Sequence, residues 1–140
     1  MLFSLLNKTL TGQDFALFAQ FHELVFIFYI LKKNDNESSR IFQILTLCYK
    51  LSGFKMNSLT ARVLSIKMIS DKISGKLENW AEILEQLPQT IIQSEEYKNS
   101  LLIIQFHELG NNNKAIQLAQ QMSAAHIACV DSLRSNGIYE

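Results

Sequence analysis

The sequence is poor in residues that interrupt regular structure, with one proline and five glycines among 140 residues. Asn-Gly, a strong two-residue hairpin signal, occurs only at residues 136–137, near the end of the chain. β-Hairpins are therefore disfavoured, and helices are the default expectation. The length suits one domain built around one core, so residues 1–140 are interpreted as a single domain.

An excess of charge of one sign is also missing, because 13 basic residues balance 13 acidic ones. This balance argues against a nucleic-acid partner, which would require a basic surface. The two cysteines, Cys48 and Cys129, match neither a disulfide framework nor a zinc spacing, and they are interpreted as reduced, buried thiols. His126 and Cys129 are three residues apart, but no further ligand stands at metal-binding spacing, so we expect no metal or cofactor.

A long unbroken apolar run is absent as well. Residues 15–31 are the most membrane-like stretch, but Gln20, His22 and Glu23 interrupt it and leave residues 24–31 as its longest apolar run. A spanning helix needs about 20 apolar residues, so we expect no membrane span. The N-terminus has no basic lead and only a short apolar run, which predicts a cytoplasmic protein without a secretory signal.

Apolar residues at helical spacing, together with caps and stops, predict an all-α fold of about six helices. The expected helices cover residues 14–31, 38–52, 57–74, 77–87, 94–109 and 114–133. Polar residues 32–36 are expected to form a loop, and Pro88 is expected to end the fourth helix. Residues 1–12 are interpreted either as an accessory helix or as a surface for a second protein, and residues 135–140 as a frayed tail.

An internal period of 34 residues relates the later helices. Ala81 and Ala115 are separated by this period, and so are the pairs Ile69/Ile103, Lys76/Gly110 and Leu84/Leu118. Thirty-four residues is the length of a tetratricopeptide (TPR) unit, which carries a small residue where its second helix crosses its first. The period predicts three stacked TPR-like helical hairpins, and a compact helical bundle is the alternative.

Stacked hairpins present their first helices on a concave face, which is the candidate binding site. The sequence places mostly apolar residues there, and an apolar groove suits the hydrophobic face of an amphipathic helix. The alternative is that the same residues form the core. The expected groove consists of Phe21, Leu24, Phe28, Leu31, Val63, Ile66, Ile73, Tyr97, Ile104 and His107.

Catalytic motifs are not evident, and we expect no enzyme activity. No glycine-rich phosphate loop, nucleophile elbow or zinc motif occurs in the sequence. The string Gln-Phe-His-Glu-Leu occurs twice, at residues 20–24 and 105–109, and could suggest paired acid and base groups. Chance is the better explanation, because the two copies fall at different places in their repeats.

A series of local features follows in order from Ala61 onward. They are residues 61–66, Gly75-Lys76 with Trp80-Ala81, Leu87-Pro88, and Leu101-Leu102 through Glu108-Leu109-Gly110 to Ala115 and Ala119. This order resembles the TPR-like chaperones of the type III secretion needle subunit, the YscG/PscG type. The resemblance covers roughly the last 80 residues, and the first 35 are longer and more aromatic than that family suggests.

The resemblance implies a cytoplasmic co-chaperone with two protein partners. One is a small helical-hairpin co-chaperone, and the other is the needle subunit, whose amphipathic C-terminal helix would lie in the concave groove. Burying that helix would keep a self-polymerising subunit monomeric without nucleotide. The alternative is another all-α adaptor, or a secreted bacterial effector that uses the same surface for a different protein.

Overall fold

The computed structural model describes residues 12–75 and 80–130, and all regular structure in these residues is α-helical. The expected all-α class is confirmed, with eight helices in the described residues rather than six. They are α2 (Gly12–Leu31), α3 (Asp35–Leu51), α4 (Ser58–Ser74), α5 (Trp80–Glu85), α6 (Gln89–Ile92), α7 (Glu95–Glu108), α8 (Asn112–Gln120) and α9 (Ala124–Cys129). The accessory helix proposed for residues 1–12 and the tail at 135–140 lie outside the described residues, except for Gly12.

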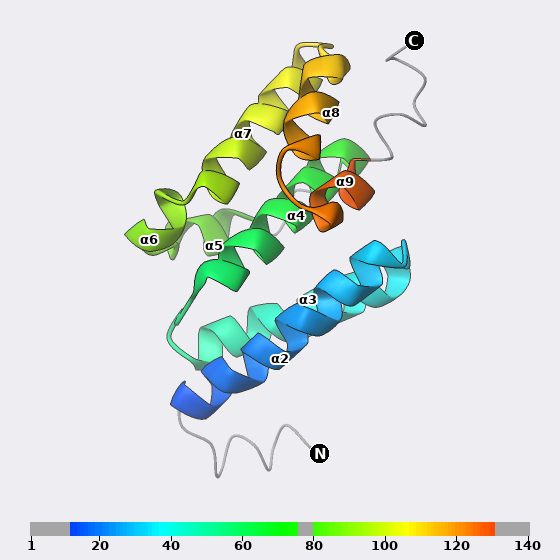
Figure 1. Ribbon diagram of the computed structural model, residues 1–140. Helices are drawn as coiled ribbons and strands as arrows, with labels where there is room; N and C mark the ends of the chain where they lie inside the picture. Colours follow the sequence, from blue (N-terminus) through cyan, green and yellow to red (C-terminus); the bar gives the residue numbers. More distant parts are fainter. Residues whose placement is uncertain (1–11, 76–79, 131–140) are drawn as a thin grey trace.

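A tight turn joins α2 to α3 and makes them a helical hairpin (Figure 1). Lys33 has a φ of 56°, in the left-handed region, and Asn34 caps α3 by accepting a hydrogen bond from the Glu37 N–H at 3.2 Å. The second helix therefore begins at Asp35, and the expected loop over residues 32–36 is wrong in its second half. An asparagine before acidic residues is a helix start as much as a loop signal.

The start and end of α4 agree with the sequence pattern. Asn57 and Thr60 form a capping box, in which each side chain accepts a hydrogen bond from the backbone of the other. Gly75 ends the helix with a φ of 76°, a conformation that glycine adopts without steric cost.

The last expected helix, over residues 114–133, is two helices in the described residues. α8 ends at Gln120, and Ser123 begins α9 by accepting a hydrogen bond from the His126 N–H at 3.3 Å. A serine at this position competes with the continuing helix through its own backbone contacts. The other unexpected helix, α6, follows Pro88, which sits at its N-cap, where a proline is tolerated.

The helices pack as hairpins placed side by side. α2 packs along α3, α4 packs most extensively along α7, and α7 pairs with α8 (Figure 1). Ala115 and Ala119 are fully buried, which lets α8 approach α7 closely. The short helix α9 contacts α2, α4 and α8, so the first and last described helices meet.

Candidate protein-binding surface

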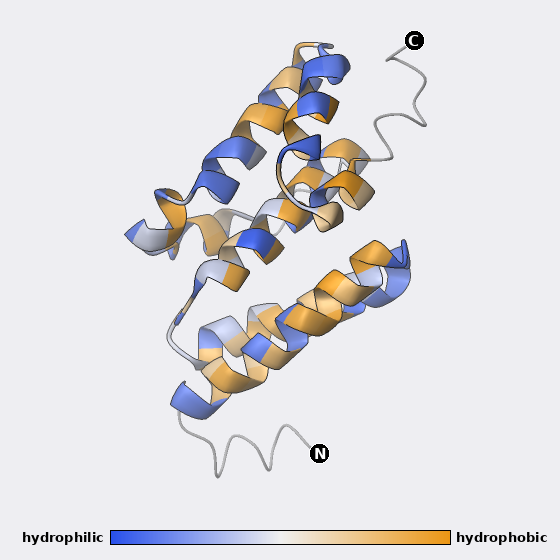
Figure 2. Cartoon of the chain, viewed as in Figure 1, coloured by the Kyte–Doolittle hydropathy of each residue, from blue (hydrophilic) through white to orange (hydrophobic). Residues whose placement is uncertain are grey.

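The outer face of α2 carries a stripe of large apolar side chains that the described residues leave in solvent. Leu17, Phe21, Leu24, Phe28 and Leu31 are 55%, 63%, 60%, 52% and 47% exposed. They follow one another at intervals of four, three, four and three residues, which keeps them on one face of the helix. Figure 2 shows hydrophobic residues along most of α2. We call these five residues the α2 stripe.

The opposite face of α2 is buried in the core. Phe15, Ala19, Phe26 and Ile30 are at most 8% exposed. α2 is therefore apolar on two sides, and only one side is covered by the described chain. A helix that is apolar all round normally has neighbours all round, so the exposed side indicates an interaction surface.

A buried carboxyl group fixes the orientation of α2. Glu23 is fully buried, and it accepts hydrogen bonds from the Tyr49 hydroxyl at 2.8 Å, from the Thr60 hydroxyl, and from the Asn57 amide at 3.5 Å. Burial raises the pKa of Glu23, and the three hydrogen bonds oppose that rise. The donors come from α3 and from the start of α4, so this cluster sets which face of α2 points outward.

The structure does not bring the ten expected groove residues onto one open face. The four residues from the first hairpin, Phe21, Leu24, Phe28 and Leu31, are exposed, and the structure adds Leu17 to them. Val63 and Ile66 are instead 0% exposed, as the core interpretation anticipated. The remaining four, Ile73, Tyr97, Ile104 and His107, are half-buried.

α9, the last helix in the described residues, contributes to the burial of α4, which also packs against α7 and α2. α9 packs against both α2 and α4, and the Cys129 Sγ donates a hydrogen bond to the Ile66 carbonyl oxygen at 3.2 Å. Sequence reasoning placed no helix start at Ser123 and therefore did not foresee this packing. The signal was present as a serine three residues before the histidine whose N–H it caps.

His126 anchors α9 through a chain of hydrogen bonds. Its Nε2 is 2.9 Å from the Ser65 Oγ, and its Nδ1 is 2.7 Å from the Ser123 Oγ. The Ser65 hydroxyl donates to the Glu96 carbonyl oxygen at 3.1 Å, so Nε2–H is the donor to Ser65. In the neutral imidazole, Nδ1 then accepts from the Ser123 hydroxyl. Burial, with a smaller effect of Arg62, lowers the pKa of His126 to about 4.

The Ser65–His126 contact has the atoms of a nucleophile and its base, but it is not an open site. Both side chains are 0% exposed, and the Ser65 hydroxyl already donates to a backbone carbonyl. A substrate could not reach the serine without removal of α9. The pair is a structural clamp between α4 and α9.

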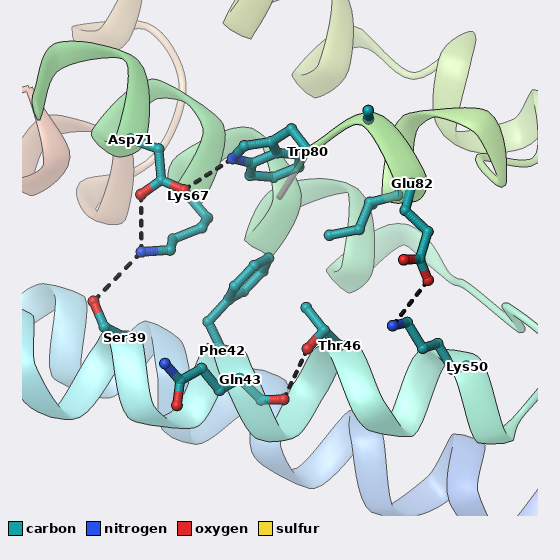
Figure 3. Close-up of a pocket in the computed structure, with 11 residues that line it drawn as sticks. Ser39, Phe42, Gln43, Thr46, Lys50, Lys67, Asp71, Trp80 and Glu82 are labelled. Carbon is teal, nitrogen blue, oxygen red and sulfur yellow. Dashed lines mark hydrogen bonds and ion pairs between the residues drawn. The ribbon is translucent and has the colours of Figure 1, made fainter. Parts of the chain in front are cut away.

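A cleft of about 570 Å³ lies between α3, α4 and α5 (Figure 3). Lys67 donates to Asp71 at 2.9 Å and to Ser39 at 3.4 Å, and the Trp80 indole donates to the other Asp71 oxygen at 2.8 Å. Phe42 lies beneath, with its ring 5.8 Å from that of Trp80. Lys67 and Asp71 thus bond to each other, and their hydrogen bonds link α3, α4 and α5 across the cleft. Their charges are satisfied and are not available to a ligand.

The two copies of Gln-Phe-His-Glu-Leu have different surroundings. Glu23 is buried in the core, whereas Glu108 is exposed and pairs with Lys72 at 2.8 Å. His22 bonds to the carbonyl oxygen of Phe18, and His107 bonds to Asn112. The copies therefore form no shared acid–base site.

The thiols and other metal-binding side chains form no cluster in the described part of the chain. No group of three His, Cys, Asp or Glu side chains there could hold a metal ion. Cys48 is fully buried, and burial raises its pKa to about 11. Burial likewise raises the pKa of Cys129 to about 12. Both groups are therefore thiols at neutral pH, which disfavours thiolate chemistry.

Comparison of the chain with protein-family models, with curated proteins and with solved structures finds no match. One helix in the described ranges, over Gln13–Leu31, is long and apolar enough to cross a membrane by length and composition alone. The same helix supplies Phe26 and Glu23 to the interior of this fold.

Proposed function

We propose that this chain is a non-catalytic protein-binding module that holds an amphipathic helix of a partner protein against the α2 stripe. The observation that carries the proposal is the alignment of five half-exposed Leu and Phe side chains on one face of a long helix. Helix-in-groove and helix-on-helix recognition use anchors at this spacing.

Covering the stripe would supply a useful binding free energy. Full burial of a Leu or Phe side chain is worth about 1.5–3 kcal/mol, so covering the exposed half of each stripe residue contributes roughly 1 kcal/mol. Five such contributions favour a complex with a helix that is already ordered, because an ordered ligand loses less conformational entropy. The rigid anchoring of α2 by the buried Glu23 cluster favours binding for the same reason.

The partner would be a protein that associates through an apolar helix. A module that covers such a helix keeps the partner monomeric by mass action and requires no nucleotide. This behaviour is that of a chaperone or co-chaperone, and the resemblance to needle-subunit chaperones makes a needle-like subunit the first partner to test. A small helical-hairpin protein is the second partner that the resemblance implies, and an adaptor role toward another helix is the alternative.

The experiment measures binding of a fluorescent amphipathic helix, first the C-terminal helix of a needle subunit and then a designed helix with Leu at its contact positions. Leu24→Asp/Phe28→Asp should weaken binding by roughly 30-fold or more, because two anchors of about 1 kcal/mol each are lost and two charges must be desolvated. Fluorescence anisotropy at several protein concentrations gives the Kd.

The matched control is Leu101→Asp/Leu109→Asp, which changes two exposed leucines of the α7 region, at 44% and 73% exposure. This variant should bind the helix as the original chain does. Equal affinity of the α2 variant and the original chain, or an equal loss in the α7 variant, would contradict the assignment of binding to the α2 stripe.

A further inference from the structure

We propose that two copies of this chain pair through their α2 stripes, antiparallel to each other, when no partner helix is bound. This inference rests on the proposed function, because the dimer would cover the surface that the partner helix needs. Pairing would then be a self-covered resting state, and the partner helix would displace the second copy.

The stripe has the repeat of a coiled-coil seam. Leu17, Leu24 and Leu31 follow one another at intervals of seven residues. Phe21 and Phe28, which lie between these leucines in the sequence, are also seven residues apart. Apolar residues at two positions of each heptad form the seam through which helices pair. The seam from Leu17 to Leu31 is about 21 Å long at 1.5 Å per residue, which is two heptads.

The charge pattern permits self-pairing. Between Phe15 and Leu31 the helix has no lysine or arginine, and its one acidic residue, Glu23, is buried in the core. Charged residues beside a seam normally select one partner and repel others. Between Phe15 and Leu31 this seam therefore carries no flanking like charges that would repel a second copy.

The orientation follows from residue size and from the end of the helix. An antiparallel two-fold pair places Phe21 of one copy against Leu24 of the other, and Phe28 against Leu17, so that each ring meets a smaller side chain. A parallel pair would set Phe21 against Phe21 and would bring the two Lys32 ammonium groups together at one end. The antiparallel pair keeps these lysines at opposite ends, and it opposes the helix dipoles.

The surface area that the two stripes would bury indicates a weak, reversible dimer. In this register Leu17, Phe21, Leu24 and Phe28 of the two copies face one another and Leu31 lies at the rim. Together these half-exposed side chains amount to on the order of 1,000 Å², the lower end of specific interfaces. A reversible dimer with a Kd in the micromolar range is therefore expected. A much tighter dimer would block partner binding, and a much weaker one would not form.

Sedimentation equilibrium of the full chain over about 1–100 µM tests the proposal directly. The original chain should show a monomer–dimer equilibrium, and Leu24→Asp should raise its dissociation constant at least tenfold. Leu109→Asp, at a 73% exposed leucine away from α2, should leave it unchanged. Phe28→Ser provides a second stripe variant, and circular dichroism verifies that each variant is folded.

Orientation is tested by mixing Leu17→Cys chains with Phe28→Cys chains under mild oxidation. The mixture should give cross-linked heterodimers in excess over either homodimer. Predominant self-cross-linking of each variant would overturn the antiparallel arrangement.

Three other results would overturn the dimer. The chain could be monomeric at all concentrations, it could dimerise with no effect of Leu24→Asp, or it could dimerise only after removal of residues 1–11, which would assign the stripe to that segment. Pelleting of a monomer with phosphatidylcholine vesicles would assign the stripe to a membrane surface. Binding of the amphipathic helix to a strictly monomeric chain would leave the proposed function intact and refute only the dimer.

Discussion

Replacing His126 should reduce the acid sensitivity of this fold. The pKa of His126 is lowered from 6.5 to about 4 in the folded chain, so the unfolded chain takes up this proton first as the pH falls. The neutral imidazole stabilises the fold fully above pH 6.5, and that contribution is lost as the pH falls toward 4. At 1.36 kcal/mol for each pKa unit, the loss by about pH 4.5 is roughly 2–3 kcal/mol.

Glu23 changes stability in the opposite direction over part of the same range. Its pKa is raised in the folded chain, so the fold binds this proton before the unfolded chain does and gains stability as the pH falls. The histidine effect is therefore measured in a Glu23→Gln background. Urea unfolding followed by circular dichroism at about pH 7 and about pH 4.5 gives the free energy of unfolding at each pH.

The expected result is a fall of roughly 2–3 kcal/mol between the two pH values in Glu23→Gln and a much smaller fall in Glu23→Gln/His126→Gln. His22→Gln in the same background is the control, because His22 bonds only to a backbone oxygen of its own helix among the hydrogen bonds found. Full pH dependence in the double variant, or its loss in the His22→Gln variant, would show that His126 is not the source of the effect.

Three further substitutions probe the contacts that position the helices, each measured as a free energy of urea unfolding at about pH 7. Glu23→Ala should lower the free energy of unfolding by about 2–4 kcal/mol, because it leaves a cavity and unpaired buried donors. Glu23→Gln should lower it less or raise it, and equal losses in the two variants would contradict this. Asp71→Ala should cost about 2–3 kcal/mol by stranding Lys67 and the Trp80 indole, and Asp71→Asn should recover part of it; no recovery would argue against the hydrogen bonds as the cause. Gly75→Ala should cost about 1 kcal/mol, because its φ is 76°, and a neutral result would contradict the backbone argument.

The sequence predicts the helical class and several helix starts well, because both depend on local signals. Asn57 and Ser94 cap α4 and α7 at the expected positions, and Gly75 ends α4. These outcomes depend on residues within one turn of each other. The break at Ser123 was not predicted, because the alanines on both sides favour a continuous helix. The break is stabilised by the contact of His126 with Ser65, which is 61 residues away in the sequence.

The candidate surface was predicted in part, for a related reason. Helical periodicity identifies which residues share a face, but it does not identify which face of an all-round apolar helix is buried. In α2 the expected residues Phe21 and Phe28 lie on the solvent-exposed side of the helix. They do so because Glu23, on the other side, is buried against α3 and α4. For α4 the same pattern placed Val63 and Ile66 in a groove, yet α9 packs against this helix and both residues lie in the core.

The contact between α2 and α9 has a consequence for synthesis of the chain. α2 is synthesised before α9, and although its inner face packs mainly against α3, the part of that face that contacts α9 is covered only when Ser65 and His126 have both emerged and α9 has docked. Until then the nascent chain exposes part of the inner face of α2 as well as the α2 stripe, a state prone to aggregation. Translation stops or truncations before residue 124 should therefore yield insoluble protein even though α2 to α8 are present.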